Sequence, residues 1–238
     1  MKRVVVSAVL AVSSVAAQAA NNIDTLGSLA QSEFRNLSED LGAALSYKAL
    51  APAEPLGITG FDVGVEVTST SLQHSNLFDK ASSGSGLSTL PVPKLHVHKG
   101  LPFNVDVGAF YSSIPSTNIK LMGAELRYAF IEGGVAMPAV ALRGTYTKLS
   151  GVDQLDLNTR GLELTASKGF AMLTPYAGVG KVWTNSTPNN VPVLKEESFA
   201  MNKLFVGANL NFGLMNMALE GDKTGDATSY GLKFGFRW

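Results

Sequence analysis

Two kinds of side chain alternate along the last twelve residues of the chain. Small or polar residues occupy the odd positions from 227 to 237, and the even positions end in Phe234, Phe236 and Trp238. Successive side chains of a strand point to opposite faces of a sheet, and a lipid-facing strand needs an apolar outer set over about 9 to 11 residues. The pattern therefore predicts a membrane-spanning strand that ends on an aromatic residue.

Similar alternation predicts nine further strands from residue 58 onward. The ten predicted strands are 58–72, 92–99, 102–112, 118–131, 137–149, 155–168, 172–184, 198–212, 214–220 and 227–238. The connections that follow the first, third, fifth, seventh and ninth strands are the longer ones, which is typical of outer-membrane barrels with short periplasmic turns. We predict an all-β fold: a closed antiparallel transmembrane β-barrel of about ten strands (about 8 to 12).

Aromatic residues lie near the ends of the predicted lipid-facing bands, as they do at membrane interfaces. The predicted girdle consists of Phe103, Phe130, Phe212 and Trp238 on the periplasmic side, and of Tyr111 and Trp183 on the outer side. The alternative is a soluble β-sandwich or barrel whose core these rings fill.

The opposite faces of the strands are polar and charged, and they point inward in a barrel. The lumen-facing candidates are Asp62, Glu66, His96, His98, Asp106, Glu125, Arg127, Arg143, Glu163, Lys203, Lys233 and Arg237. An unpaired buried ion costs several kcal/mol, so the near balance of acids and bases predicts internal ion pairs. A barrel of about ten strands has little free lumen, and we expect no wide water pore.

Residues 23–45 have a helical period, because apolar residues recur there at spacings of mostly three or four. Ser38 is placed to cap a second helical piece. Pro52 and Pro55 end the helical segment and begin an extended link. The segment is expected to start on the same, periplasmic side as Trp238, and either to plug the lumen or to lie on the membrane surface. The plug candidates are Phe34, Leu37 and Leu41.

The N-terminus predicts export. Lys2 and Arg3 precede an apolar run over 4–15, and Ala17-Gln18-Ala19 fits a cleavage site, so residues 1–19 are expected to be a signal peptide. The predicted organisation is the signal peptide at 1–19, a helical plug or periplasmic segment with linker at 20–57, and the barrel at 58–238. The expected location is the outer membrane of a Gram-negative bacterium.

Composition and motifs give little sign of catalytic chemistry. The chain has no cysteine, and its 19 basic and 19 acidic residues do not suggest nucleic-acid binding. His96 and His98 share one strand face, as a metal site requires, but no third ligand is evident and ordinary hydrogen-bonded histidines are favoured. His74 and Asp79 in the longest loop lack a supporting motif. We therefore predict no enzyme activity, no cofactor and no metal.

Two stretches carry a family resemblance: residues 32–44, SEFRNLSEDLGAA, and residues 91–100, PVPKLHVHKG. They resemble a proteobacterial family of outer-membrane barrels that is known mainly as a domain of unknown function, which implies a barrel but no activity. Gly60-Phe61 after a helical segment is also similar to the hatch region of outer-membrane long-chain fatty-acid transporters. Those proteins are about twice as long, so neither their ligand-binding residues nor their transport path is transferred.

Two functions of different class remain open. The slightly favoured one is a barrel that binds or passes a small, hydrophobic molecule through a plugged narrow lumen. The alternative is a structural or surface-interaction barrel with a packed lumen, and an outer-membrane enzyme ranks third. A closed, ion-paired interior argues against transport, whereas a continuous apolar cavity supports it. The expected partners are outer-membrane lipid, the barrel-assembly machinery through the C-terminal strand, and a small-molecule ligand in the first case.

Overall fold

The computed structural model describes residues 22–82, 87–114 and 117–238. The predicted signal peptide at 1–19 lies outside these ranges. No helix among the described residues is both long and apolar enough to cross a lipid bilayer.

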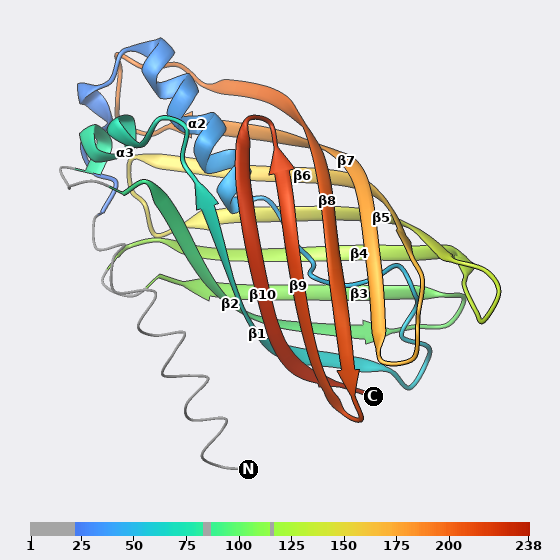
Figure 1. The fold of residues 1–238 in the computed structure, drawn as a ribbon. Coiled ribbons are helices and arrows are strands. Elements are labelled where there is room, and N and C mark those ends of the chain that lie inside the picture. Colours follow the sequence, from blue (N-terminus) through green and yellow to red (C-terminus); the bar gives the residue numbers. More distant parts are fainter. Residues whose placement is uncertain (1–21, 83–86, 115–116) are drawn as a thin grey trace, which may run out of the picture.

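The described chain forms ten strands that close into one antiparallel barrel (Figure 1). The strands are β1 (Phe61–Ser71), β2 (Thr89–Gly100), β3 (Val105–Ser113), β4 (Lys120–Glu132), β5 (Ala139–Ser150), β6 (Leu155–Ser167), β7 (Leu173–Pro188), β8 (Glu197–Phe212), β9 (Met215–Thr224) and β10 (Ala227–Arg237). Each strand pairs with its sequence neighbours, and β10 pairs with β1 to close the barrel. The predicted fold class is confirmed, and every predicted strand overlaps an observed one.

The wall of the barrel is apolar outside and polar inside. On β4, Met122, Leu126 and Phe130 are half-exposed on the outer face, whereas Glu125 and Arg127 between them are buried inside. A soluble protein would bury the apolar set instead. An exposed apolar outer wall around a charged interior is the arrangement of a transmembrane β-barrel, because the closed pairing satisfies the strand backbones within lipid.

The two ends of the barrel differ. One end, the turn end, carries the connections after the even-numbered strands together with Trp238, whose N–H and C=O bond to Phe61. The opposite end, the loop end, carries the connections after the odd-numbered strands. Phe103, Phe130 and Phe212 lie toward the turn end, and Tyr111 and Trp183 lie toward the loop end, all exposed on the outer wall. Phe103 belongs to the turn before β3 rather than to a strand.

A cap covers the loop end, and it consists of η2 (Leu26–Ser28), α2 (Gln31–Leu45) and α3 (Ser75–Ser82). The prediction that the N-terminal segment starts on the same side as Trp238 is therefore wrong. From α2, residues 46–60, here called the lumen segment, run through the barrel to β1 at the turn end. The physical reason is that the apolar face of α2 finds apolar partners only in the loop-end half of the lumen, where Val92, Phe110 and Leu121 point inward.

Helix α2 runs without a break across Ser38, so the predicted second helix start at that residue is also wrong. The Ser38 hydroxyl instead donates a hydrogen bond to Ser186 of β7 at 2.8 Å. The break falls earlier, at residues 29–30, where the Ala30 N–H donates to the Glu33 carboxylate at 2.8 Å. Helix α3 was not predicted, because its eight residues lie in a segment read as loop.

Candidate functional site

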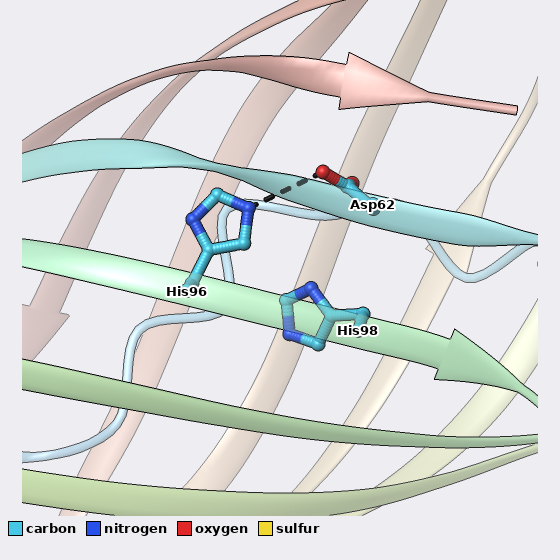
Figure 2. Close-up of side chains that lie close together, drawn as sticks. All are labelled: Asp62, His96 and His98. Atoms are coloured by element: carbon cyan, nitrogen blue, oxygen red, sulfur yellow. Dashed lines mark hydrogen bonds and ion pairs between the residues drawn. The ribbon is translucent and has the colours of Figure 1, made fainter.

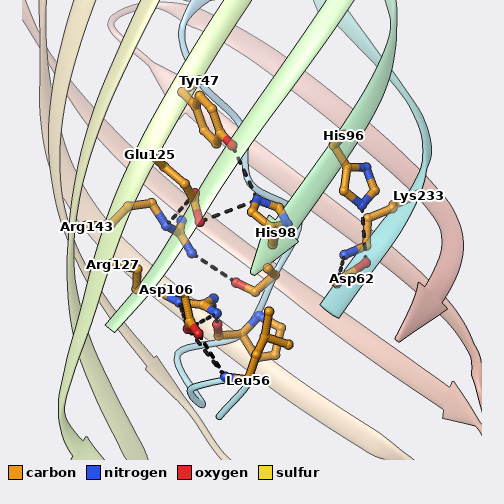
Figure 3. A network of polar contacts seen from close by, with 12 residues as sticks. Tyr47, Leu56, Asp62, His96, His98, Asp106, Glu125, Arg127, Arg143 and Lys233 are labelled. Atoms are coloured by element: carbon orange, nitrogen blue, oxygen red, sulfur yellow. Dashed lines mark hydrogen bonds and ion pairs between the residues drawn. The ribbon is translucent and has the colours of Figure 1, made fainter. Parts of the chain in front are cut away.

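The structure places all twelve lumen-facing candidates on the inner wall. Eleven of them are buried, with no more than 5% of the residue exposed, and Arg237 is partly exposed near the turn end. They form two larger ion-paired groups and the separate pair of Arg127 and Asp106, and Figure 3 shows part of this network beside the lumen segment.

Asp62 of β1 is the centre of the first group. Its Oδ2 accepts hydrogen bonds from Lys233 Nζ at 2.9 Å and Arg237 Nη2 at 2.6 Å, and its Oδ1 lies 3.2 Å from His96 Nε2 (Figure 2). Neighbouring Glu66 pairs with Lys94 at 3.1 Å. These residues come from β1, β2 and β10, which the pairing of the first and last strands brings together.

The second group crosses the barrel from β2 to β8. His98 Nε2 lies 3.4 Å from Glu125, whose other oxygen lies 3.2 Å from Arg143 Nε. Arg143 also donates to Glu163 at 3.0 Å, and Lys203 donates to the second Glu163 oxygen at 2.7 Å. Acids and bases thus alternate around the wall, and this compensates part of the cost of burying them.

The lumen segment is bonded to the wall along its length. Lys203 donates to the Tyr47 carbonyl at 2.8 Å, Arg143 to the Ala51 carbonyl at 3.2 Å, and Arg127 to the Pro52 carbonyl. Further toward the turn end, the Leu56 N–H donates to Asp106, which also holds Arg127 at 2.6 Å. The charged wall therefore satisfies the backbone of an extended segment that has no strand partner, as every buried backbone group requires.

Sequence reasoning missed four further lumen residues. Lys94 shares the inward face of β2 with His96 and His98, and Asp222 occupies an inward position of β9, so the alternation itself carried the signal for both. Lys48 donates to the Ala43 carbonyl at 2.7 Å, and the Tyr47 hydroxyl lies 3.3 Å from His98 Nε2. No alternation exists in the lumen segment, so Tyr47 and Lys48 carried no signal.

Asp62, His96 and His98 are the one group among the described residues whose donor atoms lie close enough to hold a metal ion, all within 4.8 Å of one another. The sequence had shown the two histidines without a third ligand. Asp62 already bonds to Lys233 and Arg237, and these two cations would repel a divalent ion. The cluster therefore fits a buried ion-pair network better than a metal centre.

The plug candidates Phe34, Leu37 and Leu41 lie on the face of α2 that packs against the barrel. They are buried there in one apolar cluster with residues of the barrel wall. Polar contacts also anchor this helix to the loop-end connection between β1 and α3 and to α3 itself. Asp40 accepts the backbone N–H groups of Gln73 and His74, at 3.1 and 2.7 Å. Glu33 pairs with Lys80 of α3 at 2.7 Å, and the hydrogen bond from Lys80 lowers the pKa of Glu33.

The loop residues His74 and Asp79 do not form a catalytic pair. His74 Nδ1 lies 3.5 Å from Asp40, and Asp79 accepts a hydrogen bond from the Leu87 N–H at 3.4 Å. A hollow of about 340 Å³ lies beside His74, between α2 and the β9–β10 hairpin, and its rim includes Glu39, Asp226 and Met201. His74 and Asp79 thus help to hold the cap in place.

No protein-family model matches the chain, and no curated protein matches it. Similar solved structures include the N-terminal β-barrel domain of Pseudomonas aeruginosa OprF, with 16% identity over 74% of this chain and 97% of that chain and a TM-score of 0.36. Neisserial surface protein A has 8% identity over 75% and 94% of the two chains and a TM-score of 0.31. Ail, the attachment invasion locus protein of Yersinia pestis, in complex with the heparin analogue sucrose octasulfate, has 10% identity over 75% and 97% and a TM-score of 0.30.

All three scores lie below 0.5, so the barrel assignment rests on the strand pairing and on the polarity of the wall. The chain is a small β-barrel of the outer-membrane type. These comparisons show no likeness to the family of unknown function or to the fatty-acid transporters that the sequence resembles.

Proposed function

We propose that this protein is an outer-membrane barrel that its own N-terminal segment keeps closed, and that it acts through the surface at its loop end. The observation that carries the proposal is the bonding of the lumen segment, whose carbonyls accept from Lys203, Arg143 and Arg127. A backbone held in this way fills the lumen permanently. The predicted signal peptide and the apolar outer wall support the outer membrane of a Gram-negative bacterium as the location.

Passage of a small molecule fits these contacts less well. A transport path requires continuous free space, whereas the turn-end half of this lumen holds a dense ion-pair network and the loop-end half is filled by Phe34, Leu37 and Leu41. Opening it would break five or more buried polar contacts, each with a desolvation cost of about 1 to 3 kcal/mol. The alternative of a packed structural or surface-interaction barrel is therefore the better supported one.

The loop end supplies the surface that such a function needs. It presents the cap and the long β7–β8 connection, which extend beyond the wall, together with the hollow beside His74. None of these features forms a catalytic arrangement within the residues that the structure covers. We therefore propose a binding or structural role for this surface.

Conductance in planar lipid bilayers tests the proposal. We expect the mature chain, residues 20–238, to show no stable ion current, and a variant that lacks residues 22–58 to form open pores of small conductance. The matched control lacks residues 22–45 only: it loses η2 and α2 of the cap but keeps the lumen segment, and we expect it to stay closed or nearly so. Heat-dependent gel mobility verifies that each variant folds into a barrel. A stable current through the mature chain would reject the proposal.

A further inference from the structure

Five basic side chains project outward from the loop-end half of the wall. They are Lys120 of β4, Lys148 of β5, Arg160 of β6, Lys181 of β7 and Lys223 of β9, all exposed. Their charged groups have no hydrogen-bond or ion-pair partner among residues 22–82, 87–114 and 117–238. The inward bases are all paired. Lys99 donates to the Gly100 carbonyl of its own turn, and Lys168 donates to the Gly134 and Val135 carbonyls of the neighbouring β4–β5 turn. Among the described residues, the other unpaired ammonium is that of Lys195 in the β7–β8 connection, so the unpaired cations of the wall itself belong to its loop-end half.

The register of the barrel arranges these cations in a band. Lys148 pairs with Met122, two residues from Lys120 toward the turn end, and Arg160 pairs with Tyr146, again two residues from Lys148. Lys181 continues the series, because it pairs with Leu162, two residues beyond Arg160. Strands of a barrel are tilted by about 35 to 45° from its axis, so positions staggered in this direction from strand to strand lie at nearly equal height. The five cations thus encircle much of the wall at one level.

Aromatic side chains place this level at a membrane interface. Arg160 lies between its register partners Tyr146 and Trp183, both exposed on the outer wall. Tyr and Trp concentrate at the headgroup level of a bilayer, and the apolar band lies on the turn-end side of these residues. The cations therefore sit at the height of lipid headgroups.

A groove on the outer wall adds a place for a lipid. It has a volume of about 560 Å³ and is lined by the apolar Val179 and Leu204 together with Asn202 and Lys223. Lys181 pairs with Asn202 in the register, so two unpaired lysines flank the groove from neighbouring sides, about 10 Å apart across β8.

We propose that this band binds the phosphate groups of anionic lipids in the leaflet at the loop end, with Lys181 and Lys223 around the groove as the principal site. An acyl chain would pack on Val179 and Leu204, and the headgroup phosphate would accept hydrogen bonds from the two ammonium groups. The charge favours this ligand, since basic residues near a membrane surface attract anionic lipids. The apolar floor, continuous with the lipid-facing wall, favours a lipid over a soluble anion.

Native mass spectrometry of the full mature chain in detergent tests the proposal. The protein is mixed with equal amounts of phosphatidic acid and phosphatidylcholine with identical acyl chains. We expect about tenfold preferential retention of phosphatidic acid by the mature chain, and nearly equal retention of the two lipids by the double variant Lys181→Gln/Lys223→Gln. The matched control, Lys168→Gln/Lys195→Gln, removes the same charge from the turn end and from the β7–β8 loop, and it should keep the preference.

Three outcomes would overturn the proposal. Equal retention of the two lipids by the mature chain would show that the band has no preference for a phosphate headgroup. An equal loss in the control variant would reduce the effect to net charge. Displacement of phosphatidic acid by inorganic phosphate at equal concentration would identify a site for soluble anions. Heat-dependent gel mobility keeps the comparison to variants that have folded.

Discussion

At the scale of the residue, the interior of this barrel is built on carboxylates that each hold more than one cation. Asp62 bonds to Lys233, Arg237 and His96, and Glu163 bonds to Arg143 and Lys203. An ion pair of this kind gains little over an apolar pair of the same volume, but loss of one partner leaves an uncompensated buried charge. Single substitutions in the network are therefore expected to cost more than the pairs themselves contribute.

Replacement of Asp62 by Asn should reduce the free energy of unfolding by about 3 to 5 kcal/mol, because Lys233 then remains buried without its counter-charge. Urea unfolding of the barrel in lipid vesicles measures this, with the fluorescence of the two tryptophans, Trp183 and Trp238, as the signal. The control Asp156→Asn changes an exposed residue and should stay within about 0.5 kcal/mol. The second variant Asp62→Asn/Lys233→Met should recover part of the loss. A cost below about 1 kcal/mol for Asp62→Asn would contradict this account of the network.

At the scale of the element, α2 is fitted closely to the inside of the loop end. A Cβ atom on Gly42 would lie 2.6 Å from the Thr184 hydroxyl of β7, so glycine permits the approach of helix and wall. Phe34, Leu37 and Leu41 bury one face of the helix, whereas the strands are held by their own ladder of hydrogen bonds. The cap and the barrel therefore differ in what stabilises them.

Replacement of Phe34 by Ala should loosen the cap and leave the barrel intact. The side chain is fully buried, and its loss costs about 3 to 5 kcal/mol in comparable cores. Hydrogen exchange followed by mass spectrometry should show faster exchange over 31–45 with unchanged protection in β3 to β8. Ser32→Ala, on the exposed side of the same helix, is the control and should exchange like the unaltered chain. Uniform loss of protection through all strands would mean that the cap and the barrel unfold as one unit.

The strands could be predicted from the sequence because each carries a strict alternation, which fixes both its position and the face that points inward. The ends of β2 and β9 were placed several residues short, since Pro91 and Lys223 interrupt the apolar set. The identity of the lumen residues followed from the same alternation, but their partners did not. Which carboxylate holds Lys233 depends on the pairing of β1 with β10, and these strands lie at opposite ends of the sequence. The lumen segment has no period at all, so its path through the barrel carried no signal.

At the scale of the whole molecule, the segment that runs through the lumen comes before the ten barrel strands in the sequence. The cap lies at the loop end, the lumen segment leads to the turn end, and β1 begins beside Trp238. The fifteen residues 46–60 span up to about 50 Å when extended, which is ample for this crossing. We propose that the short turns lie in the periplasm, the usual orientation of such barrels, which would place the cap and the long connections outside the cell.

Single cysteines test this arrangement on intact cells, because the chain has none of its own. Ser32→Cys on α2 and Glu196→Cys in the β7–β8 connection are both exposed at the loop end, and a membrane-impermeant maleimide should label both. Leu214→Cys, exposed in the turn between β8 and β9, should react only after the outer membrane is permeabilised. Comparison of residues 196 and 214 gives the orientation of the barrel in the membrane. Residue 32 then shows independently whether the lumen segment carries the N-terminal helix to the loop end. If residue 32 reacts together with 214 rather than with 196, the N-terminal segment does not pass through the barrel.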